Sequence, residues 1–477
     1  MQHSRTKIVA TLGPASTDPA VFCRLLEAGL DVARLNFSHG DLQTRRTYLQ
    51  VARGIADQQT LAIMGDLCGP KIRVGKVGGP GMSVEPGDEI TFVREPTLGE
   101  NKTLSSNYAC LVDDLEVGQR VLIDDGLIRM IVMDKTPDSV RCQVTVGGCI
   151  LSNKGLNLPN TRVNLPSVTD KDWQDIDWAI EQRLDYLALS FVRSAEDVRT
   201  VRKYLEKRDA PIGLVSKIEM PQAIDDLDAI IEASDVVLVA RGDLGVEMDL
   251  TAVPLLQKKI VAACHEAGVP VIVATQMLQS MVDNASPTRA EVSDVANAIL
   301  DGADAVMLSG ETAVGKYPVG AVLVLQEIAA QTESYIIKQG LGFAAPKLLQ
   351  MTHNRTAAIA HGAYNIAADV DARLVVVWSQ AGGSARYMSK NRFNIPIIAL
   401  STDFAAVRRM AMFFGVRPVR ADLPKHFDDL PAMVDELLTR YGWAQNGDRV
   451  VIAAGAPLGT AGVTNSLSVH TVGAFDG

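Results

Sequence analysis

The 477-residue sequence lacks the features that mark membrane, disulfide-stabilised and nucleic-acid-binding proteins. None of its six cysteines forms a Cys-x-x-Cys pair, so neither a zinc site nor a disulfide framework is expected, and reduced thiols are the default. Its 46 basic residues are outnumbered by 56 acidic ones, which disfavours a nucleic-acid partner but allows a phosphorylated small molecule in a locally basic cleft. No apolar run is long enough to cross a bilayer and no signal-peptide core is seen, so we expect a cytoplasmic protein without a membrane partner.

Alternating strand-like and helix-like segments dominate the chain, which is too long for a single core. The alternation stops after Gly69-Pro70. Residues 71–166 are rich in Gly, Thr and Val and contain no convincing helix, while Asp124-Asp125-Gly126 between two apolar runs is typical of a β-hairpin. We therefore expect a small β-barrel domain inserted at this point.

Outside the insertion, eight parallel strands with intervening helices predict a closed (β/α)8 barrel, that is, a TIM barrel. The expected barrel strands cover residues 7–12, 32–37, 61–67, 186–192, 212–218, 236–240, 269–274 and 305–308. Beyond residue 345 a second alternation predicts an independent C-terminal α/β domain. The predicted limits are 1–70 and 167–345 for the barrel, 71–166 for the inserted domain and 346–477 for the C-terminal domain.

Two neighbouring barrel strands end in charged residues. Lys217 and Glu219 lie two residues apart at the end of one strand, so on an extended backbone their side chains share a face. Asp243 follows the next strand and adds a second carboxylate. One ammonium and two carboxylates at adjacent strand ends would suit a divalent cation together with an anionic oxygen. The alternative is a pair of solvated salt bridges, the commoner fate of an isolated Lys-x-Glu.

Other strand ends are polar too, and the active sites of such barrels form at the carboxyl ends of the strands. Structural accidents seldom place polar groups at this many ends of apolar strands, so we expect a site for a polyvalent anion. The further strand-end residues are Arg34, Asn36, Ser38, His39, Asp66, Lys71, Arg73, Arg241, Thr275, Gln276, Ser309 and Glu311.

Six stretches of the sequence together resemble the pyruvate kinases. They are KIVATLGPAS from Lys7, ARLNFSHG from Ala33, SKIE from Ser216, ARGDLG from Ala240, ATQML from Ala274 and MLSGETA from Met307. They occur in the order found in that family, and the resemblance covers essentially the whole chain. It resembles the compact bacterial forms of the family.

The resemblance implies phosphoryl transfer from phosphoenolpyruvate to ADP, giving pyruvate and ATP in glycolysis. It implies that Glu219 and Asp243 bind Mg²⁺ or Mn²⁺. Lys217 would face the phosphoryl group and the enolate oxygen, where negative charge develops during transfer. Arg34 and Arg73 would hold phosphoryl oxygens with their planar forks of donors.

The resemblance also places the rest of the substrate and the proton route. The substrate carboxylate is expected at the backbone amides of Gly242 and Asp243, with Thr275 binding it and orienting a water. Thr275, Ser309 and Glu311 would line the route of the proton to the enolate carbon, and we expect a water relayed through hydroxyls as the donor. A simple helix cap is the alternative role of Ser309 and Glu311.

The nucleotide phosphates are expected near His39 and Lys171 by family position, although a surface lysine is usually only solvated. The inserted domain, hinged near Lys71 and Pro166, is expected to close as a lid that keeps water from the phosphoryl group.

Many members of the family bind a monovalent cation through counterparts of Asn36, Ser38, Asp66 and a threonine. Here Leu67 stands at the threonine position, and Lys71 stands where potassium-requiring members carry glutamate. An ammonium at Lys71 would replace the missing charge, so the sequence resembles the potassium-independent branch and K⁺ is expected not to be required. The alternative is that Lys71 is merely an exposed hinge residue.

A turn of small residues, SQAGGS from Ser379, lies between a strand and a helix of the C-terminal domain. Exposed amides at such a turn can cradle phosphate. In related enzymes this region binds an activating sugar phosphate or nucleotide, so Ser379, Gly382, Gly383 and Ser384 are expected to do so here. A generic tight turn is the alternative. Family precedent also suggests a homotetramer.

Two competing functions are weighed against this one. A metal-dependent aldolase, or another barrel that uses phosphoenolpyruvate, can also pair Glu and Asp around Mg²⁺, but the β insertion and the spacing at Lys217 count against it. A catalytically silent relative kept for effector binding is disfavoured because the lysine, both metal carboxylates and both arginines are present.

Overall fold

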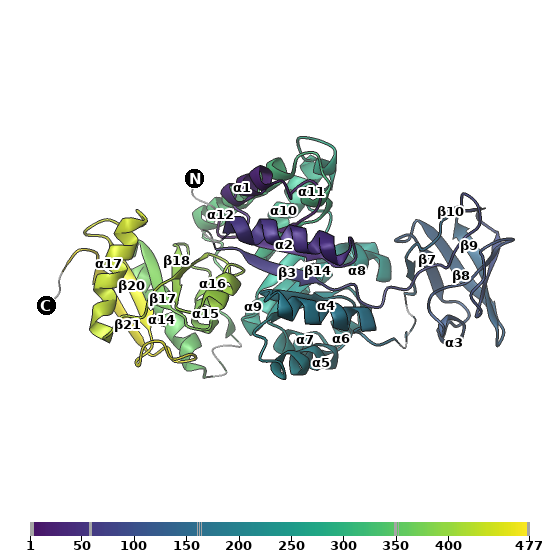
Figure 1. The fold of residues 1–477 in the computed structure, drawn as a ribbon. Coiled ribbons are helices and arrows are strands. Elements are labelled where there is room, and N and C mark those ends of the chain that lie inside the picture. The colour runs from purple at the N-terminus through teal and green to yellow at the C-terminus, as the bar shows by residue number, and fades with distance from the viewer. Residues whose placement is uncertain are drawn as a thin grey trace.

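The structure, a computed structural model, describes residues 4–56, 60–159, 161, 163, 165–347, 351 and 353–474. Three bodies follow one another in Figure 1, with a helix-covered barrel in the middle, an all-β body at one end and a C-terminal α/β body at the other. The segment that forms the all-β body leaves the barrel after strand β3 and returns to it at helix α4.

The barrel is a closed sheet of eight parallel strands in the order β1-β16-β15-β14-β13-β12-β3-β2, which confirms the predicted TIM barrel. Each strand is a short apolar run that is almost entirely buried, as expected for a sheet covered by helices outside and filled by side chains inside. All eight predicted strands are present, with ends that differ by at most three residues. They are β1 (Lys7–Thr11), β2 (Val32–Asn36), β3 (Ala62–Asp66), β12 (Tyr186–Leu189), β13 (Gly213–Ile218), β14 (Val236–Ala240), β15 (Val271–Ala274) and β16 (Ala305–Leu308).

Helices on the outside of the barrel connect its strands. Several begin at side chains that accept hydrogen bonds from first-turn N–H groups, among them Asp18, Thr169 and Thr288. The segment between β13 and β14 forms two helices that meet at Asp226, whose Oδ2 accepts a 2.7 Å hydrogen bond from the Ala195 N–H. The helices are α1 (Pro19–Glu27), α2 (Leu42–Ala56), α4 (Asp170–Glu181), α5 (Ala195–Glu206), α6 (Pro221–Asp225), α7 (Leu227–Ala233), α8 (Arg241–Glu247), α9 (Val253–Ala267), α10 (Arg289–Asp301), α11 (Gly310–Ala313) and α12 (Pro318–Gln339), with 3-10 turns η1 (Leu250–Ala252) and η2 (Gln279–Val282).

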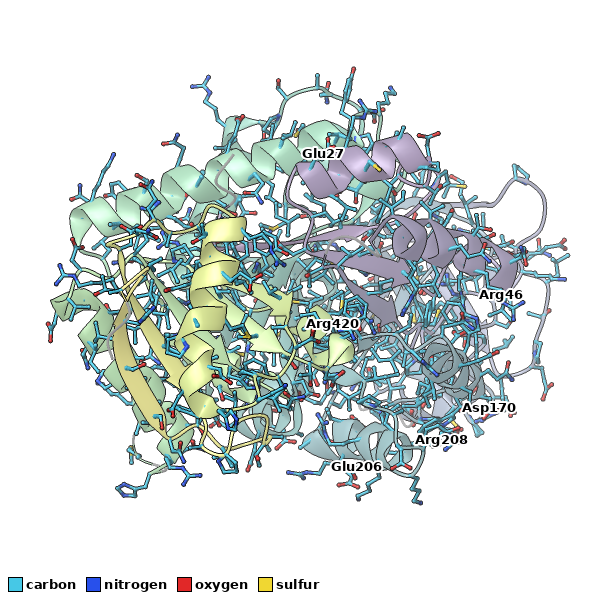
Figure 2. The ribbon with its side chains drawn as sticks, turned by 60° about the vertical axis from the view of Figure 1, so that its left-hand side comes forward. Glu27, Arg46, Asp170, Glu206, Arg208 and Arg420 are labelled. Carbon is cyan, nitrogen blue, oxygen red and sulfur yellow. The ribbon has the colours of Figure 1, made fainter. Side chains whose placement is uncertain are left out.

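The outward faces of these helices are charged. Figure 2 shows Arg46 of α2, Asp170 at the start of α4 and Glu206 at the end of α5 on the outside, and all three are exposed. Within the described parts of the chain, no helix combines the length and apolar character needed to cross a membrane.

The inserted body contains a six-stranded sheet in the order β11-β7-β8-β9-β5-β6 and a two-stranded sheet of β10 and β4. The predicted hairpin joins β7 to β8, and Asp124, Asp125 and Gly126 in its turn all have positive φ. The expectation that no helix lies here was wrong, because α3 (Leu111–Asp114) is one turn, too short to show a helical period. The strands are β4 (Met82–Val84), β5 (Glu89–Val93), β6 (Thr103–Leu104), β7 (Arg120–Ile123), β8 (Ile128–Lys135), β9 (Ser139–Val146), β10 (Gly148–Ile150) and β11 (Leu156–Asn157).

The C-terminal body is a five-stranded sheet in the order β19-β18-β17-β20-β21, in which only β21 runs antiparallel to its neighbour. Strand β19 and helices α16 and α17 are absent from the sequence-based expectation. Strand β19 lies at the edge and contains Pro418, and a proline-containing run is ordinarily taken for a loop. The elements are α14 (Arg355–Asp369), β17 (Leu374–Trp378), α15 (Gly383–Lys390), β18 (Ile397–Ser401), α16 (Phe404–Met410), β19 (Val416–Arg420), η3 (Phe427–Asp429), α17 (Leu430–Arg440), β20 (Arg449–Ala454) and β21 (Ser466–Thr471).

The barrel and the C-terminal body share one hydrophobic cluster, which runs from inward-facing strand residues into α14, α15 and the sheet beyond. An ionic cluster lies in the same contact. Asp304, just before β16, has its Oδ2 2.7 Å from Lys390 Nζ and its Oδ1 3.2 Å from a guanidinium nitrogen of Arg392. All three side chains are buried, so the two bodies are joined by charge as well as by apolar packing.

Candidate active site

Lys217 lies at the centre of a buried ionic cluster at the carboxyl ends of the barrel strands. Its Nζ is 2.7 Å from Glu219 Oε1 and 3.4 Å from Asp66 Oδ1, and it donates a 2.7 Å hydrogen bond to Ser190 Oγ. The lysine side chain is 12% exposed, and both carboxylates are buried. Ser190 is not among the residues predicted from the sequence, although it directly follows β12 and the same strand-end rule could have found it.

The charges in this cluster shift the pKa values of its members and keep Lys217 protonated. Burial alone would lower the pKa of Lys217, but the negative charges of Asp66, Glu219 and Asp243 outweigh it and raise that pKa above its ordinary value. Burial raises the pKa of Glu219 in spite of the lysine, and Asp243 adds to the rise. The pKa of Asp66 is lowered, because Lys217 and Arg34 more than offset its burial. The lysine is thus held as a cation that is largely shielded from water.

Arg34 is fixed beside the lysine by both ends of its guanidinium. Its Nε donates to Asp66 Oδ2 at 2.7 Å and another of its nitrogens is 2.6 Å from the same oxygen, while a third donates to Thr11 Oγ1 at 2.8 Å. Since Thr11 Oγ1 in turn donates to the Leu308 carbonyl, the guanidinium is oriented by strands β1, β3 and β16 together. Two cations, Arg34 and Lys217, therefore share Asp66.

The carboxylates fit a hard divalent cation. Glu219 Oε1 is buried and, although close to Lys217, accepts no hydrogen bond of good geometry from any described residue. Asp243 is near enough for its charge to raise the pKa of both Lys217 and Glu219. Among the described residues no set of three or more His, Cys, Asp and Glu is arranged to bind a metal. A cation held by Glu219 and Asp243 would thus take its other oxygen ligands from substrates or water, as Mg²⁺ ordinarily does.

Thr275 and Gln276 adopt left-handed backbone conformations, with φ values of 71° and 54°, which are strained for residues other than glycine. Thr275 Oγ1 accepts a 2.8 Å hydrogen bond from the Gly242 N–H at the start of α8. Arg241 holds the turn, because it donates to the Thr275 carbonyl at 2.8 Å and to Asp294 Oδ1 at 2.7 Å. The structure therefore brings Gly242 and Thr275 together as predicted, and it gives Arg241 a positioning role that strand-end pattern alone did not reveal.

Ser309 and Glu311 lie at the end of β16 and the start of α11. Glu311 is buried, and its two oxygens accept backbone N–H bonds from Ser309 at 2.7 Å and from Leu278 at 3.1 Å. Each carboxylate oxygen of Glu311 thus accepts one backbone hydrogen bond, and the side chain joins the loops after β15 and β16. This geometry matches the capping alternative for Glu311 and leaves the Ser309 hydroxyl as the more suitable of the two for a proton route.

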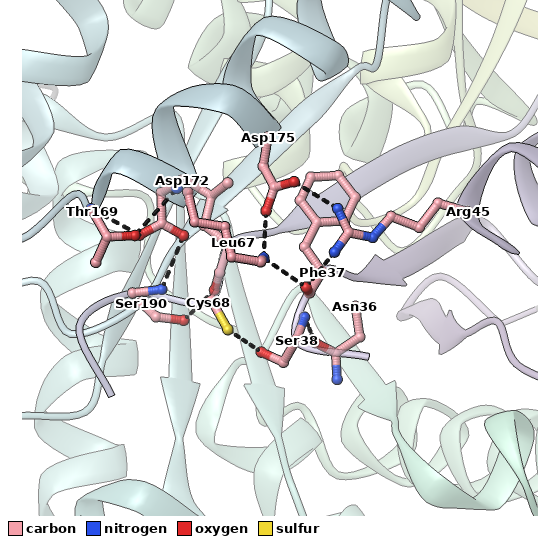
Figure 3. Close-up of polar contacts among 12 residues, drawn as sticks. Asn36, Phe37, Ser38, Arg45, Leu67, Cys68, Thr169, Asp172, Asp175 and Ser190 are labelled. Atoms are coloured by element: carbon pink, nitrogen blue, oxygen red, sulfur yellow. Dashed lines mark hydrogen bonds and ion pairs between the residues drawn. The ribbon is translucent and has the colours of Figure 1, made fainter. Parts of the chain in front are cut away.

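His39 and Lys171 each contact the loop that follows β2. Lys171 Nζ donates to the Phe37 carbonyl at 3.1 Å and lies 2.7 Å from Asp175 Oδ2 (Figure 3). His39 Nδ1 is 3.0 Å from the side-chain amide nitrogen, Nδ2, of Asn36, which directly precedes Phe37. The Asn36–His39 loop therefore carries an exposed imidazole and is contacted by the half-exposed Lys171 ammonium.

The residues expected to bind a monovalent cation belong to that loop and to the end of β3. Asn36 Oδ1 accepts from the Ser38 N–H at 3.1 Å, and Ser38 Oγ accepts from Cys68 Sγ at 3.0 Å. Leu67 is buried and offers only its carbonyl, which accepts a 2.8 Å bond from Ser190 Oγ. Asp66 is already paired with Arg34 and Lys217.

Arg73 and Lys71 lie with the inserted sheet and not with the barrel cluster. Arg73 donates from its side chain to the Asn153 carbonyl at 2.9 Å. The Lys71 side chain runs beside Gly155, where an added Cβ would lie 3.1 Å from Lys71 Cε. Across the described chain, no hydrogen bond or ion pair links either residue to Arg34 or Lys217.

One buried hydrogen bond joins the inserted body to the site helix α8. Asn157 of β11 donates from Nδ2 to Glu247 Oε1 at 2.8 Å, and both side chains are buried. Burial raises the pKa of Glu247 above its ordinary value. Helix α8 therefore carries Asp243 near one end and a contact with the inserted sheet at the other.

The small-residue turn of the C-terminal body lines a cavity of about 560 Å³ at its contact with the barrel. Gly382 has φ of +93° and Gly383 has open space where a side chain would lie. Ser379 Oγ accepts from the Ala385 N–H at 3.0 Å, and Ser384 pairs with the Thr464 hydroxyl. The two serine hydroxyls thus stabilise the turn, while Gly382 and Gly383 are among the residues that line the cavity.

A closed parallel barrel whose strand ends gather a buried lysine, carboxylates and a guanidinium is typical of the (β/α)8-barrel enzymes. Comparison with known proteins identifies the family. The pyruvate kinase barrel-domain family matches residues 3–322, and the pyruvate kinase alpha/beta-domain family matches residues 357–470. The chain belongs to the pyruvate kinase family.

Individual relatives match over nearly the full length. A pyruvate kinase of Mycobacterium intracellulare is 39% identical over 474 residues, covering 99% of both chains. One of Geobacillus stearothermophilus is 41% identical over 473 residues, which cover 98% of this chain and 80% of that protein. The crystal structure of a Cryptosporidium parvum pyruvate kinase superposes with a TM-score of 0.91 at 34% identity, covering 98% of this chain and 96% of that one.

Proposed function

We propose that this enzyme transfers the phosphoryl group of phosphoenolpyruvate to ADP, giving pyruvate and ATP in glycolysis, with Mg²⁺ or Mn²⁺ as cofactor. The observation that carries the proposal is the Lys217 ammonium, buried between Glu219 and Asp66 and beside the fixed Arg34 fork. A cation held in a water-poor site stabilises an oxygen that gains negative charge as its bond to phosphorus breaks. The family assignment supports the same reaction.

The roles of the other site residues follow from their positions. Glu219 and Asp243 would hold the divalent cation, which supplies positive charge to substrate oxygens when bound. Lys217 faces the phosphoryl group and the enolate oxygen, and Arg34 binds phosphoryl oxygens. Arg73 joins Arg34 only if the inserted body turns towards the barrel, because its present partner belongs to the inserted sheet. We infer that this turn is the lid closure that excludes water.

The substrate carboxylate would bind the amides of Gly242 and Asp243 together with Thr275. The Gly242 N–H now donates to Thr275 Oγ1, so this hydroxyl occupies the place that a carboxylate oxygen would share. We propose that the enolate carbon is protonated from water through the Thr275 and Ser309 hydroxyls, with Glu311 positioning both loops. His39 and Lys171 would bind the nucleotide phosphates.

A coupled assay for pyruvate tests the reaction and its metal. We expect pyruvate and ATP to form from phosphoenolpyruvate and ADP, the activity to be lost with excess EDTA, and Mg²⁺ or Mn²⁺ to restore it. Aldol cleavage products without phosphoryl transfer would instead support the aldolase alternative. No turnover with any divalent cation would indicate a silent relative.

We propose that K⁺ is not required, because Leu67 offers no side-chain oxygen and Asp66 is already compensated by two cations. Activity in a tetramethylammonium buffer is expected to be the same with and without added K⁺. In the closed state proposed above, in which the inserted body turns towards the barrel and carries Lys71 with it, the double change Leu67→Thr and Lys71→Glu should create a K⁺ requirement. Near-total dependence of the unmodified enzyme on K⁺ would contradict the proposal.

We propose that Ser379, Gly382, Gly383 and Ser384 border an effector site for a sugar phosphate or nucleotide. Titration with several phosphorylated metabolites at low phosphoenolpyruvate is expected to reveal activation of about fivefold or more by at least one of them. Because Gly383 has open space around it, Gly383→Asp should abolish activation by charge repulsion, whereas Gly383→Ala should retain it. Equal responses of the two variants would place the effector elsewhere.

Three further proposals rest on the family and on the fold. The enzyme acts in the cytoplasm as a homotetramer, which sedimentation analysis checks. Its folding units follow the limits 1–70 with 167–345, 71–166 and 346–477, which limited proteolysis checks through cleavage near the three junctions between them.

A further inference from the structure

Asp175, on α4, is shared by two cations that also share a second acceptor (Figure 3). Its Oδ1 is 2.6 Å from a guanidinium nitrogen of Arg45, and its Oδ2 is 2.7 Å from Lys171 Nζ. Both cations also donate to the Phe37 carbonyl, Arg45 at 2.5 Å and Lys171 at 3.1 Å. The carboxylate and the carbonyl therefore each have one lysine and one arginine partner.

The two cations differ in their access to solvent. The Lys171 side chain is 52% exposed, whereas that of Arg45 is 6% exposed. Arg45 also stacks on the Phe37 ring, with its guanidinium carbon 4.6 Å from the ring centroid, and that ring packs edge-on against Trp178. Lys171 can thus turn outward to a ligand, while Arg45 is held in place by packing, by Asp175 and by the Phe37 carbonyl.

We propose that Arg45 is a positioning residue that frees Lys171 to bind nucleotide phosphate. The inference rests on the proposed function, in which Lys171 faces that phosphate. When Lys171 leaves Asp175 in a protein without Arg45, this 6%-exposed carboxylate would keep no ion-pair partner among the described residues, and an uncompensated buried charge is costly. Arg45 remains behind as the partner of both Asp175 and the Phe37 carbonyl. The loop that carries Asn36, Ser38 and His39 then stays in place while the lysine changes partner.

Direct measurement of ADP binding tests this, with the neighbouring arginine as the matched control. Arg45→Met is expected to weaken ADP binding about tenfold, because Lys171 must then stay with Asp175, and to raise KM for ADP with little change in KM for phosphoenolpyruvate. Arg46 lies one residue along the same helix with an exposed side chain, so Arg46→Met should bind ADP as the unmodified enzyme does.

A double variant separates this role from a purely structural one. Arg45→Met with Asp175→Asn removes both buried charges, which leaves no charge to trap Lys171, so ADP binding should return to within about threefold of the unmodified enzyme. The double variant also gives the answer if the single variant does not fold. Unchanged ADP binding by Arg45→Met, or a double variant as weak as or weaker than the single one, would overturn the proposal. Failure of the unmodified enzyme to bind ADP would overturn the proposed function itself.

Discussion

Replacement of Lys217 by Met is expected to lower kcat by about 10³-fold. The substitution keeps an unbranched side chain of similar length but removes the one ammonium that lies between Glu219 and Asp66. Because the loss concerns charge that develops during phosphoryl transfer, kcat should fall much more than KM for phosphoenolpyruvate rises. The pyruvate-coupled assay at saturating substrates and Mg²⁺ measures it.

The appropriate control removes a lysine of ordinary surface character. Lys203 on α5 pairs with Glu196 across solvent, and both side chains are 64% exposed, so Lys203→Met should leave kcat unchanged. A Lys217→Met enzyme that folds and retains more than about a tenth of the kcat of the unmodified enzyme would contradict the role assigned to the ammonium.

Asp304→Asn is expected to have the largest effect on stability. The change removes the carboxylate that compensates Lys390 and Arg392, and breaking a buried ion pair from one side costs about 3–5 kcal/mol. The apparent melting temperature should fall by more than about 5 °C, with loss of the contact between the barrel and the C-terminal body. Glu436→Gln breaks an exposed pair with Arg440 on α17 and should leave the melting temperature unchanged.

The cluster of Asp304, Lys390 and Arg392 should also make the folding stability depend on pH, and the pKa of Asp304 sets the sign of that dependence. Burial would raise the pKa of Asp304, but Arg392 and Lys390 outweigh it and lower that pKa below its ordinary value. A carboxylate with a lowered pKa in the folded state contributes stability above its unfolded pKa and loses it as pH falls through the folded one. The stability difference between the unmodified enzyme and Asp304→Asn should therefore shrink in acid. A constant difference down to pH 2 would show that Asp304 does not act through its charge.

The barrel and its central cluster could be predicted from sequence because both depend on local pattern. A buried parallel strand is a short apolar run, and a polar residue directly after it lies at the catalytic end of the barrel. Lys217 lies in β13 and Glu219 directly follows that strand, so the two side chains are two residues apart on extended backbone and meet on one face.

The features that could not be predicted from the sequence depend on contacts between distant residues, on the orientation of the inserted body or on the place of a strand in its sheet. Arg241 acts on Thr275 across two strand ends, and no spacing within one element announces that contact. Arg73 lies at the start of the inserted body, so its distance from Arg34 depends on how that body turns relative to the barrel. Strand β19 was missed because Pro418 is tolerated only at the edge of a sheet, a position that sequence does not show.

The hydrogen bond between Asn157 and Glu247 makes the inserted body and helix α8 a single mechanical linkage. The oxygen of the Asn157 side-chain amide is buried and accepts no hydrogen bond from any described residue, so this side chain has little to hold it except Glu247. During the proposed closure of the inserted body, one possibility is that this hydrogen bond breaks and leaves the buried Glu247 carboxylate without this partner. The other is that the end of α8 that carries Glu247 moves with the inserted body. In the second case the carboxylate of Asp243 moves together with the inserted body, so the metal site would change whenever that body changes its orientation.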